Sequence, residues 1–262
     1  LRPTFTFESL LKMSPIKKSI VKGTDLIFVR ELTGGIYFGK RGKSPENDYA
    51  FDTCEYKKEE VERIAKIGFE LARKRSKKLC CIDKANVLET SRLWRKTVQS
   101  MERNYKDIEV SYEFVDAVAM RLIHSPNKYD VLITSNLFGD ILTDEASVIS
   151  GSMGLMPSAS IGSQTSVYEP IHGSFPEARG KNIANPLATI LSASMMFERS
   201  FNLIKEAKMI RKIVSDSIEK KIVTEDLAEN NKSFSTSQVG DWIKERIEKE
   251  KREAKKQRAK AS

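Results

Sequence analysis

Short apolar runs that are each followed by a charged side chain recur along this chain, and they restrict its fold more than any other feature. The runs cover residues 26–29, 79–82, 110–115 and 131–134, and the charged groups after them are Arg30, Lys84, Asp116 and Asp140. Amphipathic stretches with helical spacing stand between them, for example residues 58–74. This alternation predicts a layered α/β fold. Strand ends are surface positions where charges also collect without a function, but ligands of open α/β sheets bind there, and four complementary groups favour a site.

Length and composition are those of an ordinary globular protein. The chain has 262 residues, of which 40% are hydrophobic and 31% charged, enough for one large or two modest domains. No apolar run approaches the roughly 20 residues that a bilayer-spanning helix needs, so a membrane protein is not expected. The cysteines Cys54, Cys80 and Cys81 form neither a metal-ligand spacing nor a disulfide framework. This usage indicates a reducing compartment, and we predict a cytoplasmic location.

The net charge of +9 is concentrated at the end of the chain, where residues 243–262 contain nine lysines and arginines against four glutamates. Basic segments can bind nucleic acid or an anionic membrane. Here the segment lacks aromatic residues and carries glutamates at helical spacing, such as Glu245 with Lys249. We interpret it as a basic tail, either a solvated helix or a disordered end, and expect neither nucleic acid nor membrane as a partner.

Asp140 and Asp144 stand four residues apart, which places both carboxylates on one side of a helix about one turn apart. Like charges at this spacing repel unless a cation lies between them, and oxygen ligands suit a hard divalent ion better than zinc. Asp116 is a candidate third ligand of an octahedral Mg²⁺ or Mn²⁺ site. The alternative is an acidic pair stabilised by the dipole at a helix N-terminus.

Other residues near these strand ends suit catalysis or anion binding. Lys84, partly desolvated beside a metal ion, would have a lowered pKa and could transfer protons. Tyr37 follows a flexible pair of glycines and is a candidate phenolic acid. Arg2 and Arg30 can each clamp a carboxylate with two hydrogen bonds. Without its context, each of these residues is equally consistent with an ordinary structural role.

The second part of the chain opens with small residues at 151–165, which interrupt the periodicity and indicate a crossover between domains. Residues 168–186 then form a loop punctuated by glycine and proline, with one of the chain's two histidines. The loop matches neither GxGxxG nor the P-loop pattern. Its composition alone indicates only a loop suited to close approach by a ligand.

Five segments resemble the sequence blocks of the 3-isopropylmalate dehydrogenases, which belong to the β-decarboxylating dehydrogenases. They are RELTGGIYFG at 30–39, DKANVLE at 83–89, FVDAVAM at 114–120, SNLFGDILTDEAS at 135–147 and EPIHGSFPEARGKNIANP at 169–186. Their order and spacing match the family, from Leu1 to about Ile247. The first block is specific, because relatives that act on isocitrate, homoisocitrate or tartrate usually carry a segment beginning RENTEG.

The resemblance implies a role for each matching residue. The substrate, 3-isopropylmalate, would be held by Arg2, Arg30, Val87 and Asp116, with Val87 against the isopropyl group. Tyr37 and Lys84 would be the acid–base pair. The ligands of Mg²⁺ or Mn²⁺ would be Asp116, Asp140 and Asp144. The adenosine site of NAD would be lined by His172, Gly173, Ser174, Glu177 and Asn185.

The resemblance also implies a homodimer with a shared active site, in which Lys84 and Asp116 reach the partner subunit's site and residues 39–56 form an intersubunit arm. Glu177 departs from the family, which usually has aspartate at the ribose hydroxyls. The longer carboxylate would still repel a 2′-phosphate, so NAD is favoured.

A second departure concerns the family's opening segment, which has no counterpart here. We therefore expect an N-terminally truncated, isopropylmalate-dehydrogenase-like two-domain α/β fold that lacks the first half of the cofactor domain. Residues 1–150 would form the dimerisation and substrate/metal domain, 151–242 the C-terminal part of the NAD-binding domain, and 243–262 the basic tail.

The expected activity is NAD-dependent oxidative decarboxylation of 3-isopropylmalate to 4-methyl-2-oxopentanoate in leucine biosynthesis. One alternative is another β-decarboxylating dehydrogenase, acting on homoisocitrate, tartrate or isocitrate. The other is a catalytically silent fragment that only dimerises. Because its cofactor domain would be incomplete, we expect the isolated chain to dimerise without measurable dehydrogenase activity.

Overall fold

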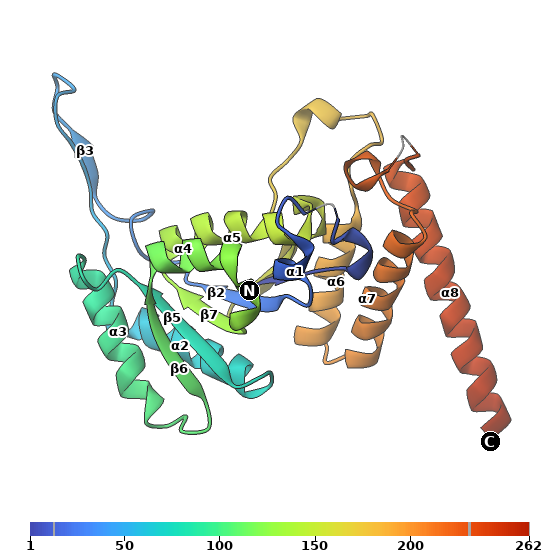
Figure 1. Ribbon diagram of the computed structural model, residues 1–262, viewed down its shortest axis with the longest axis horizontal. Helices are drawn as coiled ribbons and strands as arrows, with labels where there is room; N and C mark the ends of the chain where they lie inside the picture. Colours follow the sequence, from blue (N-terminus) through green and yellow to red (C-terminus); the bar gives the residue numbers. More distant parts are fainter. Residues whose placement is uncertain (13, 230–231, 262) are drawn as a thin grey trace. The chain divides into compact units, whose positions relative to one another are not determined.

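The computed structural model describes residues 1–12, 14–229 and 232–261, with side chains up to Glu253 (Figure 1). The chain forms two compact units, Leu1–Thr6 with Ile16–Ile149, and Phe7–Pro15 with Ser150–Ser262. Residues 7–15 cluster with the second unit, although they lie within the range 1–150 expected for the first domain.

The first unit is built on a five-stranded sheet with the order β1-β2-β7-β5-β6. Its parallel strands are β2 (Asp25–Arg30), β7 (Val131–Thr134), β5 (Lys78–Asp83) and β6 (Glu109–Phe114), and β1 (Arg2–Phe5) pairs antiparallel with β2. The parallel strands correspond to the four predicted apolar runs, so the predicted α/β fold is confirmed. All of β7 is buried, as expected of a central strand covered on both faces.

Helices α2 (Lys58–Arg73) and α3 (Glu89–Glu102) pack together with the sheet to form the main core. The start of α2 is fixed by the Glu60 carboxylate, which accepts a hydrogen bond of 2.7 Å from the backbone N–H of Lys57. Apolar residues then recur every three or four positions and face the sheet. The buried core includes Val61, Ile64, Phe69, Leu79, Trp94 and Ile133.

Three further helices belong to the sheet's connections: α1 (Lys18–Val21), α4 (Val115–His124) and α5 (Asn136–Ser150). α4 directly follows β6, and α5 follows β7 after a single residue. Strands β3 (Arg41–Lys43) and β4 (Ala50–Asp52) form an antiparallel hairpin that extends away from the sheet of this unit (Figure 1). The hairpin exposes Tyr49 and Phe51, and it lies within the range 39–56 expected to form an intersubunit arm.

The second unit combines an antiparallel hairpin, β8 (Pro157–Ile161) with β9 (Ser166–Pro170), with helices α6 (Leu187–Arg199), α7 (Ile204–Glu219) and α8 (Thr236–Ala261). α6 packs against both strands and against α7. Short 3₁₀ turns complete the unit at Glu8–Leu10, Met153–Leu155, Pro176–Ala178 and Glu225–Leu227. A further 3₁₀ turn, Pro126–Lys128, belongs to the first unit.

α8 is the longest helix and contains most of the basic tail identified in the sequence. Its outer part carries pairs of opposite charge four residues apart, Lys249 with Glu253 and Arg252 with Glu248. Across the residues that the structure describes, no helix combines the length and apolar character required to cross a bilayer.

Candidate active site

The carboxyl ends of β2 and β7 lie next to each other and position a cluster of charged side chains. Arg30 ends β2 and is in register with Thr134, the last residue of β7. After one further residue the chain enters α5, which carries Asp140 in its second turn. Gly139 permits close packing here, because a Cβ at this position would lie 2.7 Å from the Cγ of Arg30. The Arg30 side chain therefore lies against the beginning of α5.

Three side chains converge on the carboxylate of Asp140. Its Oδ1 pairs with Nη1 of Arg30 and lies 4.0 Å from Nη1 of Arg2, while its Oδ2 accepts a 2.6 Å hydrogen bond from the Tyr37 hydroxyl. Arg30 is 8% exposed, whereas Asp140 is 39% exposed. The structure thus brings together four of the residues singled out in the sequence, from β1, β2, α5 and the loop after β2.

These contacts shift the protonation equilibria of both the phenol and the carboxylate. Partial burial acts to raise the pKa of Asp140, but the Tyr37 hydrogen bond and the charges of Arg30 and Arg2 outweigh it and lower that pKa. The hydrogen bond to Asp140, with a further contribution from burial, raises the pKa of Tyr37 above its ordinary value. The site therefore holds an ionised carboxylate next to a neutral phenol that has a proton to donate.

Lys84 and Asp116 form a second, separate pair. Lys84 follows β5, Asp116 lies in the first turn of α4, and their Nζ and Oδ1 atoms are 2.6 Å apart. The hydrogen bond from Lys84 lowers the pKa of the Asp116 carboxyl, whose side chain is 66% exposed. Asp116 thus stands at the surface of the unit, and Lys84 is partly exposed beside it.

Sheet order explains why the two clusters are apart. β7 and β5 lie between β2 and β6, and at about 4.8 Å per strand the ends of β2 and β6 are roughly 14 Å apart. Among the residues with described side chains, no three His, Cys, Asp or Glu residues gather as a metal site. Asp140 and Asp144 lie on α5, whereas Asp116 of the same chain lies with Lys84.

Val87 lies in the turn between β5 and α3, and its backbone N–H donates to the Lys84 carbonyl oxygen over 2.9 Å. Its side chain is 62% exposed. Val87 therefore belongs to the Lys84 side of the sheet and not to the arginine cluster.

The histidine-containing loop lies in the second unit, between β9 and α6. His172 Nδ1 is 3.0 Å from the carbonyl oxygen of Gly173, and Gly173, Ser174 and Glu177 are exposed. Asn185 is fixed at the start of α6, where its Oδ1 accepts a hydrogen bond from the Leu187 N–H and its Nδ2 donates to Asp226, both over 2.9 Å. The loop presents its polar groups outward.

Asn136 contacts the arginine cluster directly, although its sequence position did not single it out as a site residue. Its Oδ1 accepts hydrogen bonds from Nε and Nη2 of Arg30 over 3.0 and 2.8 Å. Its side chain is almost completely buried, at 3% exposure. The available signal was its place two residues after a buried strand, where an amide has to satisfy its hydrogen bonds within the protein.

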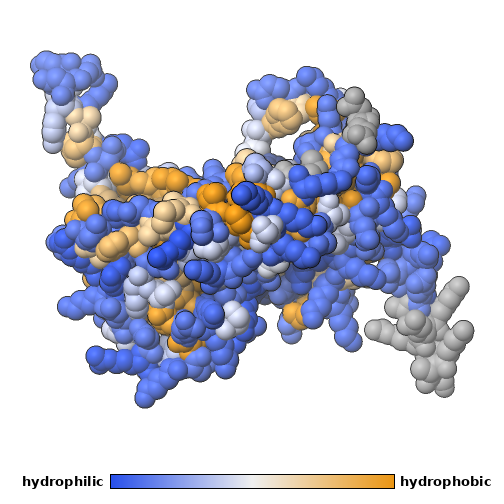
Figure 2. Space-filling view, viewed as in Figure 1, coloured by the Kyte–Doolittle hydropathy of each residue, from blue (hydrophilic) through white to orange (hydrophobic). Residues whose placement is uncertain are grey.

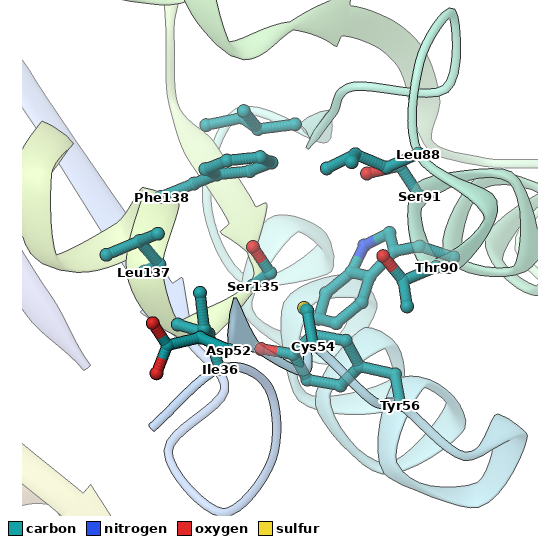
Figure 3. A pocket seen from close by; sticks show the side chains of 12 residues that line it. Ile36, Asp52, Cys54, Tyr56, Leu88, Thr90, Ser91, Ser135, Leu137 and Phe138 are labelled. Carbon is teal, nitrogen blue, oxygen red and sulfur yellow. The ribbon is translucent and has the colours of Figure 1, made fainter. Parts of the chain in front are cut away.

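A cavity of about 250 Å³ lies beside this cluster, between the starts of α3 and α5 (Figure 3). Most of its lining is apolar, and the Tyr56 ring and Ser135 form part of its wall. None of the predicted catalytic or metal-binding residues lines it; its apolar lining includes Ile36, Ile82, Leu88, Trp94, Leu137 and Phe138.

Comparison of the sequence with known proteins shows the family of this chain. Residues 1–243 match the sequence profile described as isocitrate/isopropylmalate dehydrogenase. The chain belongs to this family. It is 51% identical over 250 residues to the 3-isopropylmalate dehydrogenase of Bacteroides fragilis, and 48% identical over 253 residues to that of Aquifex aeolicus. Each match covers 95% of the chain and 70% of the relative.

Two solved structures share the fold of this chain. The isocitrate dehydrogenase of Methylococcus capsulatus superposes with a TM-score of 0.86 at 34% identity, over 94% of this chain and 72% of that one. The TT0538 protein of Thermus thermophilus gives a TM-score of 0.85 at 30% identity, over 94% of this chain and 49% of that one. These findings confirm the resemblance noted in the sequence and the isopropylmalate-dehydrogenase-like fold.

Proposed function

We propose that this protein catalyses the NAD-dependent oxidative decarboxylation of 3-isopropylmalate in leucine biosynthesis. The observation that carries the proposal is the convergence of Arg2, Arg30 and Tyr37 on Asp140. Two guanidinium groups suit the two carboxylates of a malate, and the phenol supplies a proton donor at the same place. The names of the relatives point to the same substrate.

Substrate binding would rely on the arginine pair. Arg30 is nearly buried and its guanidinium is oriented by protein contacts, so it loses little conformational freedom when it binds a carboxylate. Arg2 comes from the adjacent strand β1 and donates to the Thr143 hydroxyl over 2.9 Å, which holds it on the same side. The predicted contact of Val87 with the isopropyl group would come from the exposed turn after β5.

The donor set suits Mg²⁺ or Mn²⁺. Asp140 and Asp144 offer hard oxygen ligands one turn apart on α5, and Asp144 is exposed. Because Asp116 of the same chain lies with Lys84, the third carboxylate would be Asp116 of the partner subunit. A divalent ion at this place supplies positive charge that stabilises negative charge developing on the substrate oxygens.

A second copy would dock on the first unit. α4 and α5 expose large apolar side chains, including Met120 at 65% and Ile141 at 58%, and Figure 2 shows apolar side chains on this face. Lys84 and Asp116 stand at the surface near α4, where they can reach a partner's site. Burial of the α4 and α5 face would remove exposed apolar area and would complete two active sites together.

The chain's own residues would move two protons. Lys84 would accept the proton of the 2-hydroxyl as the adjacent C–H hydride leaves for NAD. After the carboxylate departs as CO₂, the Tyr37 hydroxyl would protonate the enol carbon. The raised pKa of Tyr37 suits this step, because the phenol keeps its proton until it is needed.

NAD would be held at its adenosine end by His172, Gly173, Ser174, Glu177 and Asn185. Their loop is exposed and Asn185 anchors its end to α6, which gives a ligand access to backbone and side-chain polar groups. The Glu177 carboxylate would accept hydrogen bonds from ribose hydroxyls and repel a 2′-phosphate.

The test compares substrates in protein that carries the family's opening segment in cis, with NAD and Mn²⁺ present and NADH absorbance as the readout. We expect the highest kcat/KM with 3-isopropylmalate. A higher value with isocitrate, homoisocitrate or tartrate would assign another activity within the family. Absence of turnover with all four would favour the silent, dimerising alternative.

A further inference from the structure

We infer that Asn136 is a positioning residue: its amide holds the Arg30 guanidinium and the Gly34–Gly35 turn that leads to Tyr37 in one arrangement. The inference rests on the proposed function for its kinetic consequences, but the contacts themselves do not. Three hydrogen bonds of the side chain and one of the backbone carry it.

On the Arg30 side, Asn136 Oδ1 accepts from Nε and Nη2 at 3.0 and 2.8 Å, so one amide oxygen engages one edge of the planar guanidinium. Nη1 is directed to Asp140. Arg has five N–H donors, and three are used in this way. In the described part of the chain, one N–H on each terminal nitrogen is left for a bound carboxylate, which is the geometry of a two-pronged clamp.

On the other side, Asn136 Nδ2 donates to the carbonyl oxygen of Gly34 over 3.1 Å. Gly34 and Gly35 form the turn two residues before Tyr37. The amide oxygen thus positions Arg30, the predicted carboxylate clamp, and the amide nitrogen positions the turn that leads to Tyr37, the predicted acid. An amide supplies both an acceptor and a donor, whereas a carboxylate supplies only acceptors and an ammonium group only donors.

Tyr56 contacts both Asn136 and the Gly34–Gly35 turn. Its hydroxyl accepts the backbone N–H of Asn136 at 2.8 Å, and Figure 3 shows the Tyr56 side chain near Ser135 and Ile36. Gly35 has φ +83°, and a Cβ there would lie 2.3 Å from this hydroxyl oxygen. The turn therefore rests directly on the phenol of Tyr56, and burial raises the pKa of that phenol so that it stays neutral.

The kinetic test is a double-mutant cycle between Asn136→Ala and Arg30→Lys, which keeps the charge but loses the fork. We expect Asn136→Ala to raise KM for 3-isopropylmalate about tenfold in the wild-type background, and to have less than about a twofold effect when Arg30 is lysine. KM for NAD should stay unchanged. Additive effects on KM would overturn the inference.

A conservative variant separates the two sides of the amide. Asn136→Asp keeps acceptors for Arg30 and loses the donor to Gly34, so we expect kcat to fall while KM for 3-isopropylmalate stays near the wild-type value. A rise in KM equal to that of Asn136→Ala would contradict the assignment. Asn136→Asp also tests the positioning role if Asn136→Ala does not fold.

A readout without turnover keeps the inference separate from the proposed function. The Nε–H resonance of Arg30, assigned by its loss in Arg30→Lys, should exchange with water about tenfold faster or more in Asn136→Ala. The matched control is Asn127→Ala, because that amide also makes three side-chain hydrogen bonds, to Ile20, Lys22 and Thr24, away from Arg30. If wild-type protein with the family's opening segment in cis fails to oxidise 3-isopropylmalate, the proposed function fails. If Asn136→Ala leaves Arg30 exchange unchanged, the positioning role fails.

Discussion

The hydroxyl of Tyr37 donates a 2.6 Å hydrogen bond to Oδ2 of Asp140, so the predicted proton donor contacts a predicted metal ligand directly. The contact joins residues 103 positions apart in the sequence. It makes the protonation of the phenol depend on the charge of the carboxylate, because a neutral phenol is the form that can donate to it.

The first prediction follows from this contact. In a spectrophotometric titration, the difference between wild type and Tyr37→Phe should show Tyr37 ionising above its ordinary pKa of 10.0. The same difference measured in the Asp140→Asn background should move to lower pH, because the carboxylate that favours the neutral phenol is gone. An unchanged midpoint would show that burial alone controls Tyr37.

Lys84→Met should abolish turnover while leaving Mn²⁺ binding largely intact, because Lys84 is proposed to move a proton and not to ligate metal. Turnover is measured by NADH formation and Mn²⁺ binding by calorimetry. Lys128→Met, at an exposed lysine elsewhere in the first unit, is the matched control. Equal loss of binding and turnover would contradict the proton-transfer role.

Asp140→Asn should weaken Mn²⁺ binding about tenfold or more, because it removes one anionic ligand from a hard-cation site. The control is Asp107→Asn, which removes a carboxylate that is paired with Arg73 at the surface. If Asp140→Asn binds Mn²⁺ as tightly as the control, the carboxylates of α5 are helix-terminus charges and not ligands.

Met120→Lys should shift the protein from dimer to monomer in sedimentation velocity experiments. It places a charge on an exposed apolar position of α4, and burying an unpaired charge in an interface is unfavourable. Val167→Lys, at an exposed apolar position of β9 in the second unit, should leave the dimer intact. A wild-type protein that sediments as a monomer would remove the shared-site mechanism.

The Asp107 carboxyl provides a pH prediction. The hydrogen bond from Arg73 lowers its pKa from 3.8 to about 2, and this effect outweighs the opposing effect of desolvation. Since the folded pKa lies below the unfolded one, its contribution to stability is complete above pH 3.8 and is lost as the pH falls through about 2. The carboxyl carbon resonance of Asp107 should titrate near 2 in wild type and closer to 3.8 in Arg73→Gln. An unchanged midpoint in that variant would exclude Arg73 as the cause.

Local spacing in the sequence was sufficient for the strands and for the pairing of Asp140 with Asp144 on one helix, because both depend on residues about one helical turn or a few strand positions apart. The family blocks likewise predicted roles for Arg30, Tyr37, Lys84 and the histidine-containing loop. These features depend on local sequence and not on the order of strands in the sheet, so they can be predicted before the structure is known.

Only the tertiary structure showed which of these residues meet. The strand order β2-β7-β5-β6 differs from the order in the chain. It places Arg30 beside α5, and it places the Lys84–Asp116 pair away from Arg30. It also revealed Asn136, whose importance comes from contacts with Arg30, Gly34 and Tyr56 that span 106, 102 and 80 positions. Contacts over such distances depend on how strands are ordered across the sheet, and the periodicity of a single strand or helix carries no information about that order.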